Sequence, residues 1–131
     1  MSKLTEAQRA FLRDNAFPAV LTTLRPDGTP HSTPVWIDEQ GGDVLFNTLV
    51  GRAKERYLRQ NPNVTVIVRD PDDQFHWVAV SGRGTLDTEG ADEHINKLSL
   101  KYMGEAWESQ PEQTRIIARI SVDKVDSSGF D

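Results

Sequence analysis

Four bases lie close together in a chain whose net charge is −5: Arg52, Lys54, Arg56 and Arg59, in the segment GRAKERYLRQNP. A helix N-terminus carries partial positive charge, so acidic residues usually occupy the first turn of a helix and bases the last. In this segment bases come first as well. The free N–H groups of a first turn, together with Arg52 and Lys54, would converge on a phosphate. The segment therefore predicts a phosphate site.

The same bases also fit a second interpretation, a helix face exposed to solvent. Glu55 and Arg59 are four residues apart, and such a pair stabilises a helix by only a few tenths of a kcal/mol. The acidic balance of the whole chain argues against a nucleic-acid partner, because binding a polyanion usually needs a broad basic surface. The expected anion is therefore a small molecule.

Other candidates for chemistry are few. The chain has no cysteine, which excludes disulfides, thiolate metal sites, iron–sulfur clusters and a cysteine nucleophile. His31, His76 and His94 stand alone, without a second ligand at the spacing of a metal motif, so no metal site is predicted. The GRG sequence at 82–84 is part of a dinucleotide fingerprint, but without a third glycine or a following helix it indicates a bend in a barrel.

The elements that must position these residues are mostly strands, in a single domain that spans residues 1–131. Helices are predicted from the capping-box pattern at 5–8, over the basic segment as far as 61–62, and over 91–104; strands are predicted over 17–24, 30–37, 44–48, 64–68, 75–86 and 116–125. Six strands broken by short helices favour a mainly β, antiparallel barrel over a doubly wound sheet.

The predicted strand at 30–37 has an unusual backbone. It contains Pro30 and Pro34, and a proline has no N–H group to donate to a neighbouring strand. We therefore expect this strand at the edge of the sheet, or bulged. Part of its backbone would then be free to meet a ligand.

Several segments resemble a known family when they are taken together. The order VLTTLRPDGTPHSTPVW, LFNTLVGRAKERYLRQNP, VTVIVRDPD, WVAVSGRGTL and HINKLSLKYMG is similar to the pyridoxamine-phosphate-oxidase-like flavin reductases, within them most of all to the actinobacterial branch that uses the deazaflavin coenzyme F-420. The resemblance covers about residues 5–126. It implies a six-stranded split β-barrel that forms a homodimer, with a cofactor in each of two grooves between the subunits.

The resemblance also implies which residues hold the cofactor. The implied residues are Arg52 and Lys54 at the phosphate, Asn47 and Thr48 beside them, Ser32, Thr33, Pro34 and Val35 along the flavin-like ring, and Phe75 and Trp77 reaching over from the partner subunit. The assignment of Arg52 and Lys54 agrees with the charge pattern of the basic segment. The assignment of the ring agrees with the proline-interrupted strand.

The activity implied by the resemblance is hydride transfer from reduced F-420 to an electron-poor small organic substrate. For such a reaction the protein supplies orientation, phosphate binding and a dry pocket. FMN has a similar tricyclic ring, a ribityl chain and a phosphate, so an FMN-dependent oxidase or reductase is an alternative, as is a non-catalytic carrier of the cofactor. His31, Tyr102 and water are the candidates for proton delivery, and no residue is assigned as catalytic.

The surroundings of the protein are predicted from what the sequence lacks. The opening residues, MSKLTEAQRAFLRDNAF, contain no apolar signal region and no small-residue cleavage site. No apolar run approaches the length that is needed to cross a bilayer. We therefore expect a cytoplasmic protein with a small-molecule substrate and no membrane partner.

Overall fold

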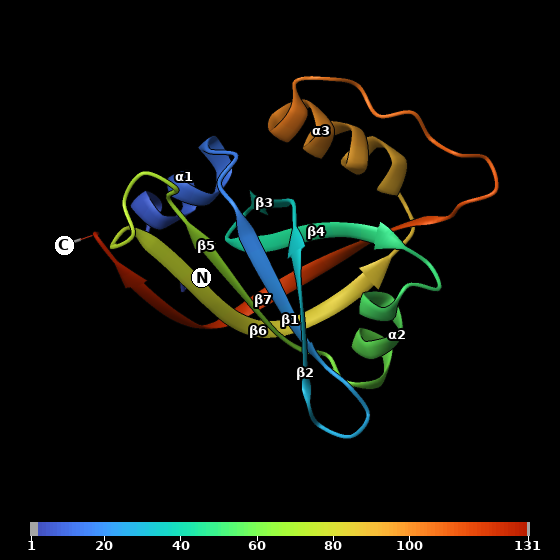
Figure 1. The fold of residues 1–131 in the computed structure, drawn as a ribbon, viewed down its shortest axis with the longest axis horizontal. Coiled ribbons are helices and arrows are strands. Elements are labelled where there is room, and N and C mark those ends of the chain that lie inside the picture. Colours follow the sequence, from blue (N-terminus) through green and yellow to red (C-terminus); the bar gives the residue numbers. More distant parts are fainter. Residues whose placement is uncertain (1–2, 131) are drawn as a thin grey trace.

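The computed structural model describes residues 3–130, which form seven strands and three helices (Figure 1). The elements follow in the order α1 (Glu6–Asp14), β1 (Ala19–Leu24), β2 (Pro30–Val35), β3 (Ile37–Gln40), β4 (Asp43–Leu49), α2 (Ala53–Gln60), β5 (Asn63–Arg69), β6 (Trp77–Asp87), α3 (Ala91–Met103) and β7 (Arg115–Ser128). None of the helices within the described residues is long and apolar enough to cross a membrane.

The strands form one antiparallel sheet in the order β2-β1-β5-β6-β7-β4-β3. The two edge strands, β2 and β3, are separated in the chain by Trp36 alone. A flat sheet cannot place its opposite edges one residue apart, so the sheet must curl until they meet. β2 and β3 are not neighbours in the hydrogen-bonded order, which leaves a seam between them. The result is the expected mainly β, split β-barrel.

The expected count of six strands was wrong, because the predicted strand at 30–37 is two strands. β2 ends at Val35, and β3 then pairs with β4 instead of β1. The sequence of β3 was hard to interpret as a strand because Asp38 and Glu39 look like turn residues. Both are almost fully buried, and ion pairs with bases of the flanking helices compensate their charges.

Two other expectations about the strands are confirmed. β2 lies at an edge of the sheet, where its two prolines interrupt little pairing. The GRG sequence lies at a bulge of β6, where the register with β7 shifts between Ser81 and Gly82. A Cβ atom at Gly82 would lie 1.9 Å from the carbonyl oxygen of Ser121, so only glycine fits there. The start of β6 was placed too early, because Phe75 lies outside the strand in an exposed loop.

The helices begin and end where the sequence indicates. Thr5 and Gln8 form a reciprocal capping box at α1, with the Thr5 Oγ1 accepting from the Gln8 N–H at 3.1 Å. α3 ends at Gly104, which has a φ of 72°. The barrel core is apolar, and its members come from strands and from α1 and α2: Phe11, Leu12, Leu21, Ile37, Phe46, Leu58, Val66, Val80 and Ile120. α3 packs against β4 and β7, outside this core (Figure 1).

Candidate functional site

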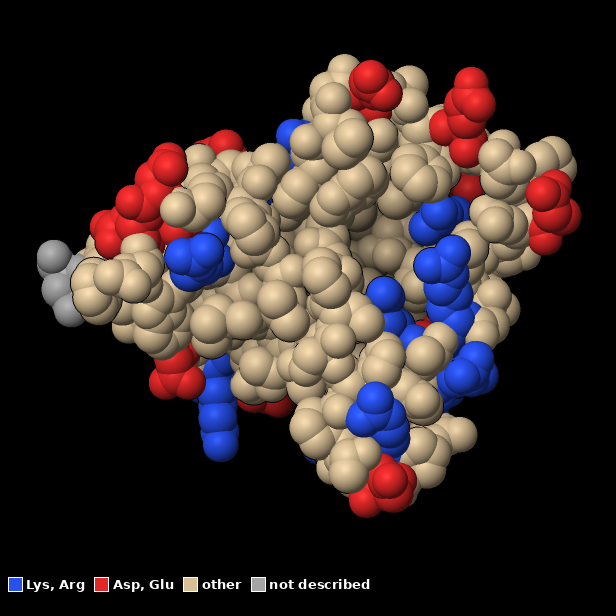
Figure 2. Space-filling model, viewed as in Figure 1, with Lys and Arg blue, Asp and Glu red and all other residues tan. Residues whose placement is uncertain are grey.

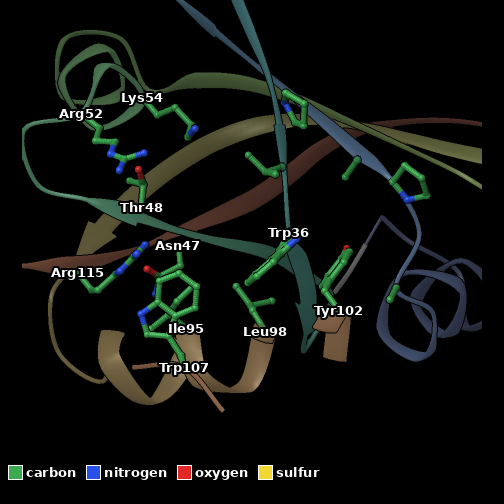
Figure 3. Close-up of a pocket in the computed structure, with 15 residues that line it drawn as sticks. Trp36, Asn47, Thr48, Arg52, Lys54, Ile95, Leu98, Tyr102, Trp107 and Arg115 are labelled. Carbon is green, nitrogen blue, oxygen red and sulfur yellow. The ribbon is translucent and has the colours of Figure 1, made fainter. Parts of the chain in front are cut away.

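A cavity of about 530 Å³ lies beside the seam of the barrel, between α2 and α3. Lys and Arg side chains gather around a hollow in this part of the surface (Figure 2). The residues that line the cavity come from six elements and four connecting segments: Ala16, Pro18, Ala19, Pro34, Val35, Trp36, Asn47, Thr48, Arg52, Lys54, Ile95, Leu98, Tyr102, Trp107 and Arg115. Figure 3 shows Arg52, Lys54 and Thr48 on one side and the α3 residues on the other.

Three bases form the polar end of the cavity. Arg52 is the N-cap residue of α2, and no side chain caps this helix start. Lys54, in the first turn, donates a hydrogen bond from Nζ to the Thr33 Oγ1 at 3.2 Å. Arg115, at the start of β7, comes from a distant part of the sequence and lies over the ring of Trp107, 4.8 Å from its centroid. Together with the uncapped first turn, these side chains concentrate positive charge.

These three bases have no acidic partner. Within residues 3–130, no carboxylate forms an ion pair with Arg52, Lys54 or Arg115. Burial lowers the pKa of Lys54, and the positive charge of Arg52 lowers it further. The same two causes lower the pKa of Arg115, and Asp92 acts more weakly in the opposite direction. Cations held together in this way are stabilised by an added anion.

The other two bases of the segment have partners within the protein. Arg56 donates from Nη1 to the carbonyl oxygen of Gly51 at 2.6 Å. Arg59 pairs with Glu55, whose buried carboxylate also accepts from the Gly51 N–H at 2.7 Å. The pair between Glu55 and Arg59 is therefore structural, whereas the first two bases face the cavity. Glu55 in the first turn and Arg59 in the last follow the usual charge order, so only Arg52 and Lys54 depart from it.

The apolar end of the cavity is aromatic. Trp36 stacks on Tyr102 with ring centroids 5.5 Å apart and planes 11° apart, and it meets Trp107 edge to face at 6.1 Å. The Tyr102 hydroxyl donates to the carbonyl oxygen of Phe17 at 3.1 Å and accepts from the Ile37 N–H at 3.2 Å. Burial raises the pKa of Tyr102. Its proton is thus committed to the protein, and Tyr102 serves as a wall of the cavity.

Most of the predicted cofactor-binding residues come together at this cavity. Six of them line it: Arg52, Lys54, Asn47, Thr48, Pro34 and Val35. Thr33 does not line it but accepts a hydrogen bond from the lining residue Lys54. Ser32 is not among the lining residues, and its hydroxyl hydrogen-bonds that of Thr22 at 2.9 Å. Phe75 and Trp77 do not line this cavity, so their predicted role depends on a partner subunit.

Trp107 and Arg115 also line the cavity, although the sequence did not predict them there. They come from the polar loop after α3 and from the first residue of β7, and no local motif marks either one. His31, a candidate for proton delivery, packs edge-on against Tyr57 and is not among the lining residues. No cluster of three or more metal-ligating side chains occurs within the described part of the chain.

Comparisons with known proteins place this geometry in context. The sequence profile of the family described as pyridoxamine 5'-phosphate oxidase matches residues 4–128. A solved structure described as an F-420 reductase superposes with a TM-score of 0.81 at 26% identity, over 89% of this chain and 94% of the other. No curated protein sequence matches the chain.

Two further solved structures share the fold. A conserved hypothetical protein from Mycobacterium tuberculosis has a TM-score of 0.78 at 23% identity, covering 95% of this chain and 84% of its own. A putative pyridoxamine 5'-phosphate oxidase from Listeria innocua has a TM-score of 0.71 at 21% identity, covering 90% of this chain and 92% of its own. The fold around the cavity is therefore shared over nearly the whole chain.

Proposed function

This chain belongs to the pyridoxamine 5'-phosphate oxidase family, and on that premise we propose that it is an F-420-dependent reductase. The family fold is an oxidoreductase-like fold that binds flavins or deazaflavins, and a structural neighbour at 26% identity is described as an F-420 reductase. The proposed substrate is an electron-poor small organic molecule. When bound, the reduced deazaflavin supplies the hydride.

The observation that carries this proposal is the set of unpaired bases at one end of an aromatic cavity. Arg52, Lys54 and the uncapped start of α2 suit a phosphate, because they supply two fixed charges and several N–H donors. The stacked wall of Trp36 and Tyr102 suits a planar ring. The residues present therefore fit a phosphorylated tricyclic cofactor.

The role of the chain's own residues is to bind and orient. Arg52 and Lys54 would hold the phosphate and so fix the ring at a constant distance from α2. Pro34 and Val35 would contact the ring from β2, where the edge position leaves backbone available. Tyr102 does not deliver a proton in this scheme, since both hydrogen-bonding functions of its hydroxyl are occupied by backbone groups.

We also propose that the protein acts as a homodimer. Val20 and Ile67 are register partners on neighbouring strands and are 40% and 41% exposed, and Phe75 is 68% exposed. Exposed apolar side chains of this kind are typical of a surface that another subunit covers. In the dimer, Phe75 and Trp77 would reach the cofactor of the partner subunit. Sedimentation at micromolar concentration tests this, and a single 14.7 kDa species would contradict it.

Two other functions use the same cavity. An FMN-dependent oxidase or reductase would rely on the same phosphate site, since FMN also carries a phosphate. A carrier would bind the cofactor without turnover. The test is to follow oxidation of reduced F-420 with a panel of enones, quinones, nitroarenes and tetrapyrroles. Oxidation that depends on both protein and acceptor supports the reductase, and binding without oxidation throughout supports the carrier.

A further inference from the structure

Asn47 presents an unusual polar atom at this cavity. It lies on β4 among the residues that line the cavity, and its side-chain Nδ2 donates to the carbonyl oxygen of Ala91 at 2.9 Å. The same Nδ2 lies 3.2 Å from the Nδ1 atom of His94 on α3. The side-chain oxygen, Oδ1, is buried and has no hydrogen-bond partner among the residues that the structure describes.

The direction of this amide is fixed by its neighbours. A backbone carbonyl oxygen can only accept, so the nitrogen of Asn47 must face Ala91. The second N–H of the amide then points to His94, which accepts at Nδ1 when its proton is on Nε2. His94 Nε2 is also buried, and it has no hydrogen-bond partner among the described residues. His94 is only 8% exposed, and burial lowers its pKa, so the neutral ring that this bond requires is the favoured form. Both N–H groups are thereby occupied.

The oxygen is left as a fixed, buried acceptor on a residue that lines the cavity. Figure 3 shows the Asn47 oxygen turned to the side where Arg115 lies. Arg115 lies over the ring of Trp107 and makes no hydrogen bond to the Asn47 oxygen. A buried acceptor without a donor is costly and rare in native proteins. A donor on a bound ligand would remove this cost.

We propose that Asn47 Oδ1 accepts a hydrogen bond from a hydroxyl of the ligand's polyol chain, and that His94 is the positioning residue that aims it. This rests on the proposed function, because the ribityl hydroxyls follow the phosphate in both F-420 and FMN. Asn47 directly precedes Thr48, beside the bases of the phosphate end. The amide therefore lies where the segment next to the phosphate would pass.

The test is a fluorescence titration with F-420, and separately with FMN, on the intact protein. Asn47→Leu removes the amide at similar size and should weaken binding about 5- to 10-fold, as expected for the loss of one hydrogen bond. His94→Leu frees the amide to rotate and should weaken binding about threefold, which is less than the loss of one neutral hydrogen bond. His94→Gln supplies a carbonyl that can accept from Asn47, and it should restore affinity.

A double-mutant cycle separates positioning from packing. If His94 acts only through Asn47, adding His94→Leu to Asn47→Leu should weaken binding no further. An equal loss in both backgrounds would overturn the positioning role.

Unchanged affinity in Asn47→Leu, while Lys54→Ala binds more weakly, would overturn this inference but leave the proposed function standing. Absence of any uptake by the wild-type protein would instead contradict the proposed function. If thermal melting shows that Asn47→Leu is unfolded, the same titration is made with Asn47→Ser.

Discussion

Bases cluster in two regions of this molecule, and they pair with carboxylates in only one of them. Along β3, Arg9 and Lys97 pair with the buried carboxylates of Glu39 and Asp38 at 2.8 and 2.9 Å. We call the residues of these two ion pairs the β3 seam, which is distinct from the gap between β2 and β3. At the cavity, Arg52, Lys54 and Arg115 have no carboxylate partner within residues 3–130.

The difference indicates what each group of bases is for. In the β3 seam, each base compensates a carboxylate that folding removes from water, so the pairs hold α1 and α3 against the barrel. At the cavity, folding brings like charges together without an ion pair to a carboxylate among the described residues, which costs stability unless an anion arrives. A base retained at such a cost is better explained by a ligand than by the fold. The comparison predicts that one set of substitutions changes stability and the other changes affinity.

The largest effect is expected in the β3 seam. Arg9→Met removes the closest partner of Glu39, whose side chain is 1% exposed, and should lower the free energy of unfolding by about 2–3 kcal/mol. Urea denaturation measures this, and affinity for F-420 should stay the same. Arg13→Met is the control, because Arg13 is more exposed and lies 3.5 Å from Glu39, so its removal should change stability much less than Arg9→Met does. Equal stabilities of the two variants would break the comparison.

The next effect concerns the cavity. Lys54→Ala should weaken cofactor binding by about 1.5–3 kcal/mol, roughly 10- to 100-fold, because a charge-assisted contact to phosphate is lost. Stability should not fall, since Lys54 has no carboxylate partner in the described part of the chain and Arg52 repels it. Lys124→Ala, an exposed base of β7 outside the cavity, is the matched control. Unchanged affinity in Lys54→Ala would remove the phosphate assignment.

Two bases of β7 allow the comparison within one strand. Arg115 lines the cavity unpaired, whereas Arg119, four residues on, pairs with Asp43 at 3.1 Å. Arg115→Met should weaken F-420 binding about fivefold, which is about 1 kcal/mol. Arg119→Met should leave binding unchanged. Calorimetric titration distinguishes them, and a greater effect of Arg119→Met would contradict the account.

Salt should affect cofactor binding at the cavity more than it affects the ion pairs of the β3 seam. Raising the salt concentration from about 0.05 to 0.5 M should weaken cofactor binding severalfold, because the cavity is open to solvent and its charges are screened. The stability difference between wild type and Arg9→Met should change little, since Glu39 is buried. Parallel titrations and denaturation curves at both salt concentrations provide the measurement. Binding that is insensitive to salt would argue against capture of an anion.

The smallest effect belongs to His94, which lies between the two regions. Burial lowers its pKa below the ordinary value of 6.5; Asp38 of the β3 seam acts in the opposite direction, and Lys97 and Arg119 act in the same direction as burial. The unfolded chain therefore binds a proton at a higher pH than the folded protein does. Stability is complete above about pH 6.5 and declines as the pH falls toward the folded pKa. His94→Gln should flatten this decline in urea denaturation, and an unchanged slope would contradict it.

Much of the fold could be predicted because its signals are local. The Thr5 capping box, the glycine that ends α3 and the edge position of β2 each follow from residue types a few positions apart. β3 could not be predicted in this way. Its acidic residues are tolerated inside only because Arg9 and Lys97 reach them from helices that are distant in the sequence.

The residues of the site likewise fall into those that a local pattern predicts and those that depend on long-range contacts. Arg52 and Lys54 are two residues apart on a single helix start, so the charge pattern points to them directly. Arg115 joins them only because β7 pairs with β4, a contact between residues that are far apart in the sequence. The role of His94 is hidden for the same reason, since its partner Asn47 lies on another element. Sequence patterns thus predict the half of the site that one element supplies.

The central claim is that the unpaired bases at the start of α2 hold the phosphate of a tricyclic redox cofactor. A crystal structure of the protein grown with F-420 tests this most directly. The account predicts the phosphate within hydrogen-bonding distance of both Arg52 and Lys54. A phosphate bound elsewhere, or electron density for solvent alone between these side chains at saturating F-420, would contradict it.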